Sequence, residues 1–80
     1  MYYVYIIQSI NCPEQHYVGY SEDLKSRIQD HNSGNSIHTA KFKPWKLMAY
    51  FAFIEKSTAQ EFEYYLKTGS GRAFLKKHLL

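Results

Sequence analysis

The stretch YVYII at residues 3–7, continued by HYVGY at residues 16–20, decides the fold of this chain. Both runs are short and rich in β-branched and aromatic residues, a composition that favours strands. The polar segment between them carries the turn residues asparagine and proline. This short gap predicts an antiparallel hairpin, with Tyr5 on its first strand and Tyr17 on its second.

A helix is expected directly after the hairpin, with Ser21 as its N-cap and acidic residues in its first turn. Leu24 and Ile28 lie four residues apart and form a narrow apolar stripe. Arg27 and His31 have the same spacing on a neighbouring stripe. The sequence therefore predicts one helix that packs on the hairpin and carries two functional groups one turn apart.

The second half of the chain predicts one strand and two helices. A loop at residues 36–44 leads into WKLMAYFAFI at residues 45–54, the longest apolar run, which is expected to be the central strand. Ser57 and Gln60 form a capping box for the next helix, and residues 72–80 have the pattern of a last amphipathic helix. The order ββαβαα predicts an α+β fold, with a three-stranded antiparallel or mixed sheet flanked by helices.

The bulk composition indicates a small globular protein. Eighty residues predict a single domain over residues 1–80, and the net charge of +3 weakly favours a polyanionic partner. Cys12 is the only cysteine, so no disulfide can form within the chain and no cysteine-rich zinc site exists. The apolar run at the N-terminus is too short to span a membrane. We therefore expect a cytoplasmic protein that does not insert into a membrane.

Several kinds of active site are absent from the sequence. There is no phosphate-binding P-loop, no nucleophile elbow and no cluster of acidic residues for a two-metal site. Tyrosine, arginine, histidine and isolated glutamates remain, and a phosphodiester is one substrate that they could handle. Arginine can bind a phosphate, glutamate can hold one Mg²⁺ or Mn²⁺ ion, and tyrosine or histidine can orient or deprotonate water.

Two tripeptides and three single residues occur in a characteristic order. They are Tyr3-Val4-Tyr5, Tyr17-Val18-Gly19, Arg27, His31 and, in the later helix, Glu63. In this order and spacing the chain resembles the GIY-YIG nucleases, specifically the small single-domain type, and is similar to the nuclease domain of bacterial excision repair. The resemblance extends over nearly the whole chain.

This resemblance implies metal-dependent hydrolysis of a phosphodiester in DNA or structured nucleic acid, through a single Mg²⁺ or Mn²⁺ ion, with DNA repair as a setting. It implies that Glu63 binds the metal and that Arg27 contacts the scissile phosphate. Tyr17, with Tyr5 as the second candidate, would position or deprotonate the water, and His31 would assist. A tyrosine base needs its pKa lowered from about 10, which Arg27 or the metal could do.

The sequence departs from the family pattern in two places. Tyr3 stands where the first motif has glycine, so substrate would approach less closely there. Larger members carry a late asparagine near the site, whereas this chain has none after Asn35. Its role would be lost or taken over by Thr68, Ser70 or Arg72.

Basic side chains outside the motifs could contact nucleic acid, although a solvated loop is an equally good interpretation of most of them. The candidates are His38, Lys41, Lys43, Lys46 and Arg72. Two alternatives to a nuclease stay open: a degenerate module that binds nucleic acid without cutting it, and a protein-interaction module. A single small domain buries roughly 600–1,000 Å² on DNA. Specificity would therefore come from a protein partner or a homodimer.

Overall fold

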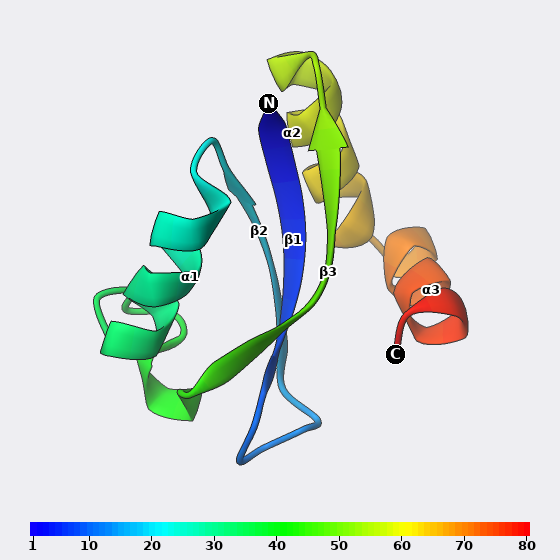
Figure 1. The fold of residues 1–80 in the computed structure, drawn as a ribbon. Coiled ribbons are helices and arrows are strands. Elements are labelled where there is room, and N and C mark those ends of the chain that lie inside the picture. The colour runs from blue at the N-terminus through cyan, green and yellow to red at the C-terminus, as the bar shows by residue number, and fades with distance from the viewer.

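A computed structural model describes residues 1–80 as a three-stranded antiparallel sheet with helices on both faces (Figure 1). The elements follow the order ββαβαα that the sequence predicts. The strands are β1 (Tyr2–Ser9), β2 (His16–Ser21) and β3 (Trp45–Phe53), and the helices are α1 (Leu24–Ser33), α2 (Lys56–Leu66) and α3 (Gly69–His78). A short 3₁₀ turn at Ala40–Phe42 interrupts the expected loop between α1 and β3. The α+β prediction is confirmed.

The central strand is β1, and the expectation that β3 would be central is wrong. The strand order is β2-β1-β3, and β1 pairs with both neighbours, for example through Val4 with Tyr20 of β2 and Phe51 of β3. Val4 to Ile7 are all buried, whereas β3 leaves Leu47 and Tyr50 exposed. The long apolar run of β3 suggested a central strand, but its side chains alternate between a face that packs in the core and a face that is exposed.

The side chains of β1 alternate between two separate cores. Val4 and Ile6 point to the face covered by α2 and α3, where they pack with Ala59, Leu66 and Leu75. This larger core fixes the second half of the chain against the sheet.

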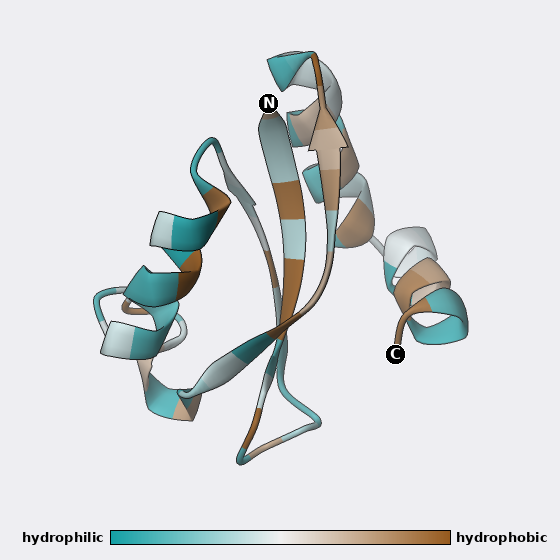
Figure 2. Ribbon diagram, viewed as in Figure 1, coloured by the Kyte–Doolittle hydropathy of each residue, from teal (hydrophilic) through white to brown (hydrophobic).

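The opposite face carries the smaller core, in which Tyr5 and Ile7 of β1 pack with Trp45. Leu24 and Ile28 of α1 close this core, and Figure 2 shows the apolar stripe of α1 turned toward the sheet. The predicted stripe is therefore confirmed. It places α1 on the same face of the sheet as Tyr5.

The first helix begins two residues later than expected. Asp23, not Ser21, is the N-cap of α1, and its carboxylate accepts a hydrogen bond from the Ser26 amide at 3.1 Å. The hydroxyl of Ser21 bonds instead to the backbone of Asp23, at 3.0 Å from its nitrogen and 2.9 Å from its oxygen. The helix ends at Gly34, whose φ of 82° is the left-handed conformation that glycine accepts most readily.

The starts of α2 and α3 also differ from the prediction. α2 begins at Lys56 after Glu55, without a side-chain cap, so the predicted capping box of Ser57 and Gln60 does not form. α3 begins at Gly69, three residues earlier than predicted, because the Thr68 hydroxyl caps it through the Gly71 amide at 3.3 Å. None of the helices is long and apolar enough to cross a membrane.

Candidate active site

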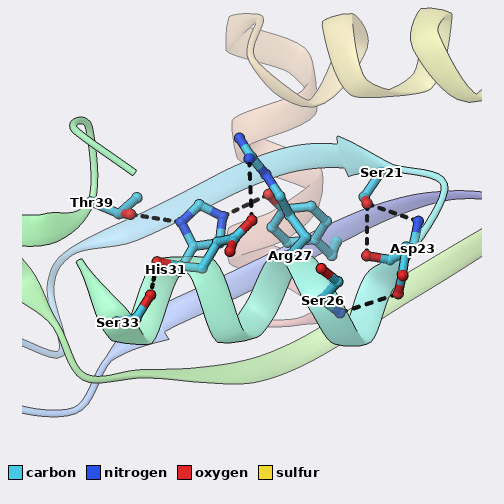
Figure 3. Close-up of polar contacts among 9 residues, drawn as sticks. Ser21, Asp23, Ser26, Arg27, His31, Ser33 and Thr39 are labelled. Atoms are coloured by element: carbon cyan, nitrogen blue, oxygen red, sulfur yellow. Dashed lines mark hydrogen bonds and ion pairs between the residues drawn. The ribbon is translucent and has the colours of Figure 1, made fainter. Parts of the chain in front are cut away.

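A chain of buried hydrogen bonds links β1, α1 and the loop that precedes β3 (Figure 3). The Tyr5 hydroxyl lies 2.7 Å from His31 Nε2, and His31 Nδ1 lies 2.6 Å from Thr39 Oγ1. Trp45 Nε1 then donates to the Thr39 carbonyl at 2.8 Å. All four side chains are at most 4% exposed. The network therefore holds His31 in one orientation beneath the surface.

Two further predicted residues lie beside this network. The Tyr17 ring is centred 6.5 Å from the Tyr5 ring and 5.2 Å from the His31 ring. Arg27, one turn before His31, is half-buried and lies 3.9 Å from the Asp30 carboxylate. The structure thus brings together the four side chains that the sequence predicts for the hairpin and the first helix.

Gly19 is needed beside Tyr5 for a steric reason. These two residues face each other across the β1–β2 ladder, and a Cβ atom at position 19 would overlap the Tyr5 hydroxyl and ring. The glycine therefore makes room for the Tyr5 side chain.

Burial sets the protonation states at this site. It raises the pKa of Tyr5 to about 12, although hydrogen bonding and positive charge from Arg27 act in the opposite direction. Burial, together with the Arg27 charge, lowers the pKa of His31 below 6.5. The hydrogen bond with Tyr5 is the main reason that the pKa of Arg27 is raised. At neutral pH the site therefore holds a neutral phenol, a neutral imidazole and a charged guanidinium.

These protonation states limit the hydrogen bonds of the network. A neutral imidazole carries one N–H proton, so His31 donates through one ring nitrogen and accepts at the other. Its two partners are the Tyr5 hydroxyl and Thr39 Oγ1. A phenol in this setting is a poor base, because burial outweighs the lowering effect of Arg27 on the pKa of Tyr5.

Glu63 approaches the same region from the other side of the sheet. It lies on α2, half-buried with 24% of its side chain exposed, and its negative charge contributes to the raised pKa of Tyr5. Lys67, one turn later, donates to Glu63 Oε2 at 3.1 Å and lies 5.9 Å from the centre of the Tyr17 ring. Lys67 therefore connects Glu63 to Tyr17. The position of Lys67, four residues after Glu63 on the same helix, is the sequence signal for this contact.

The side chains near Tyr17 suit a metal ion held by few protein groups. No group of three or more histidine, cysteine or acidic side chains is arranged to hold a metal. Glu63 contributes a single carboxylate, of which only Oε2 has a partner within the chain. One free carboxylate oxygen, with water in the remaining positions, is a donor set that Mg²⁺ accepts.

The candidates for nucleic-acid contact do not form one patch. Arg72 lines a groove of about 540 Å³ together with Tyr17 and Lys67, which places it beside the site. The other four are exposed in the loop before β3 or at the start of β3 and do not line this groove; they are His38, Lys41, Lys43 and Lys46.

The two departures from the family pattern have different consequences. Tyr3 packs edge-on against Tyr50, with ring centres 6.0 Å apart, and lies near the start of α1. Thr68 is committed to capping α3, and Ser70 is exposed at its start. Of the three residues proposed to replace the late asparagine, Arg72 is the one that shares a groove with Tyr17.

Known proteins resemble this chain over most of its length. Residues 1–77 match the GIY-YIG catalytic domain. The UPF0213 protein CPE1444 of Clostridium perfringens is 42% identical over 69 residues, which cover 84% of this chain and 71% of the relative. The solution NMR structure of the UPF0213 protein BH0048 from Bacillus halodurans matches with a TM-score of 0.56 and 32% identity, covering 96% of this chain and 84% of that one.

A longer relative has a more informative name. The structure-specific endonuclease subunit SLX1 of Debaryomyces hansenii is 30% identical over 73 residues, which cover 82% of this chain but only 21% of the relative. The fold, the arrangement of the site and these matches define the class of protein as a nuclease family. This chain belongs to the GIY-YIG family.

Proposed function

We propose that this protein is a metal-dependent endonuclease that hydrolyses phosphodiester bonds in DNA or structured nucleic acid. The observation that carries the proposal is the convergence of Tyr5, Tyr17, Arg27 and His31 on one face, with Glu63 reaching the same region from α2. Each has the chemistry that phosphodiester hydrolysis requires.

Arg27 is the group proposed to bind the scissile phosphate. Its guanidinium stays charged, and it lies at the rim of a buried network that fixes its neighbours. Such a group can form two hydrogen bonds to a phosphate and stabilise the negative charge that grows during attack. Glu63 is proposed to hold a single Mg²⁺ or Mn²⁺ ion through its free oxygen. When bound, such an ion would polarise a phosphate oxygen and favour deprotonation of water.

Tyr17 is the proposed base, and Tyr5 with His31 is proposed to position it. The Tyr5 hydroxyl is already hydrogen-bonded to His31, and its raised pKa keeps it a neutral phenol, so it is poorly suited to accept a proton. Tyr17 packs over the fixed imidazole and lines an open groove, so substrate can reach it. His31 would thus hold the Tyr17 ring in place.

The substrate and the partner are proposed on the basis of the longer relative. SLX1 is named a subunit of a structure-specific endonuclease, which supports branched or otherwise structured DNA, a protein partner and a setting in DNA repair. The cytoplasm stays the proposed compartment, in keeping with a lone cysteine, Cys12.

Cleavage assays with matched variants test this function. Plasmid, branched and single-stranded substrates would be incubated with Mg²⁺ or Mn²⁺, using the wild type, Glu63→Gln and Glu61→Gln. Glu61 is an exposed glutamate on the same helix, so its variant is the control for charge removal. We expect cleavage by the wild type and by Glu61→Gln, and none by Glu63→Gln or in excess chelator. Activity that persists in Glu63→Gln and in chelator would refute the proposed metal site.

A non-cleaving nucleic-acid-binding module is the second candidate, and one contact favours it. Lys67 already neutralises the Glu63 carboxylate at 3.1 Å, in the place where a cation would act. This candidate predicts salt-sensitive binding of nucleic acid with no cleavage at any metal concentration.

A further inference from the structure

Most of the residues that line the groove beside Tyr17 have no role in the proposed cleavage chemistry. It measures about 540 Å³ and runs from the β1–β2 connection across the edge of β2 to the junction of α2 and α3. Tyr17 belongs to both the groove and the catalytic cluster. A ligand in the groove would therefore be continuous with a phosphodiester at the site.

Half of the ten residues that line the groove are apolar: Tyr17, Val18, Leu66, Leu75 and Leu80. Leu66 and Leu75 belong to the larger core and are at most 5% exposed, so Tyr17, Val18 and Leu80 offer most of the accessible apolar surface. Gly71 permits this geometry, because a Cβ atom there would collide with the backbone of Tyr65 and Leu66. The close approach of α3 to α2 thus builds a fixed apolar surface beside a polar site.

The rim of the groove is mainly cationic. Lys67 and Arg72 line it, His16 adds a third donor, and Glu14 is its one acidic residue. Arg72 is exposed and forms no ion pair within the chain, so its charge is free for a ligand. Lys67 lies over the Tyr17 ring and marks the end of the groove nearest to the catalytic cluster.

We propose that this groove binds an unpaired nucleotide next to the scissile bond, with its base against the apolar lining of the groove and its backbone phosphate on Arg72. The inference rests on the proposed function and specifies its substrate as nucleic acid with a single-stranded segment at the cut. A paired base keeps its faces stacked within the duplex, so only an unpaired base can lie against the apolar lining of the groove. Single strands are commonly bound by a positively charged groove with an aromatic side chain, and Tyr17 is the aromatic side chain here.

Binding measurements in chelator test this site independently of cleavage. Fluorescence anisotropy would compare a labelled single-stranded oligothymidylate with a duplex of the same length, using the wild type, Arg72→Ala and Lys76→Ala. Lys76 is an exposed cation on the same helix that does not line the groove. We expect Arg72→Ala to weaken single-strand binding about fivefold and to reduce the salt slope by about 0.7, with little effect from Lys76→Ala.

A second measurement locates the ligand. Titration of ¹⁵N-labelled protein with the oligothymidylate should shift the amide signals of residues 16–18 and 71–75 more than those of residues 40–46. Equal losses of affinity in Arg72→Ala and Lys76→Ala, or shifts confined to residues 40–46, would overturn the proposal. Because no metal is present, failure here leaves the cleavage result intact. Conversely, failure to cleave leaves this binding result intact.

Discussion

The hydroxyl of Tyr5 and Nε2 of His31 share a buried hydrogen bond of 2.7 Å. The two residues are 26 positions apart in the sequence, and the bond connects the central strand to the first helix. Tyr5→Phe would leave a buried imidazole nitrogen without its hydrogen-bond partner, so we expect the free energy of unfolding to fall by about 1–3 kcal/mol. Urea unfolding followed by circular dichroism measures the change. Tyr50→Phe, at an exposed tyrosine, is the control and should change stability by less than about 0.5 kcal/mol.

His31 should make the stability of the protein depend on pH. Because its pKa is lowered in the folded state, the unfolded chain binds more protons as the pH falls through about 6.5. The free energy of unfolding should therefore decrease between pH 7.5 and pH 5.5. The His31→Gln variant should lose this part of the pH dependence, whereas His38→Gln, at an exposed histidine, should keep it. An unchanged profile in His31→Gln would show that His31 does not cause the decrease.

Gly19→Ala and Gly69→Ala should have opposite effects. The new methyl group at position 19 would collide with Tyr5, so we expect a loss of about 1–3 kcal/mol in the free energy of unfolding. The methyl group at position 69 meets no atom within 4 Å and lies in the first turn of α3. That variant should be neutral or more stable by up to about 1 kcal/mol. Thermal unfolding of both variants tests this prediction. A similar loss of stability in both would show that the collision with Tyr5 is not the cause.

Lys67 should compete with a metal ion for Glu63. Removing its ammonium group in Lys67→Met frees Glu63 Oε2, so we expect Mn²⁺ to bind about 2- to 5-fold more tightly. Electron paramagnetic resonance can measure Mn²⁺ binding without nucleic acid, which separates this effect from any contact of Lys67 with a phosphate. Lys56→Met, at an exposed lysine at the start of α2, should leave the affinity unchanged. Weaker Mn²⁺ binding in Lys67→Met would contradict the competition.

The sequence predicted the elements of the fold better than their edges and their order in the sheet. The hairpin was predictable from the strand-like composition of its two runs and from the turn residues between them. The central position of β1 depends on pairing along both of its edges, which no local sequence pattern encodes. Helix starts were misplaced because a serine can bond to nearby backbone without capping a helix, as Ser21 does. The residue types around a candidate cap are therefore not enough to predict which residue caps the helix.

The candidate site was predictable where it follows motif spacing. Tyr5, Tyr17, Arg27 and His31 converge as expected. Thr39, by contrast, joins the site from the loop between α1 and β3. It lies eight residues after His31, and no helix or strand periodicity in the sequence predicts their contact. The raised pKa of Tyr5 also could not be predicted, because it depends on burial by elements distant in sequence.

A structure determined with Mn²⁺ tests the central claim most directly. Anomalous scattering at the manganese edge would be recorded for crystals of the wild type and of Glu63→Gln soaked in MnCl₂. We predict one manganese ion bound to the Glu63 carboxylate, on the side that faces Tyr17 and Arg27, and none in Glu63→Gln. Manganese bound elsewhere, with none at Glu63 in the wild type, would contradict the single-metal phosphodiester site.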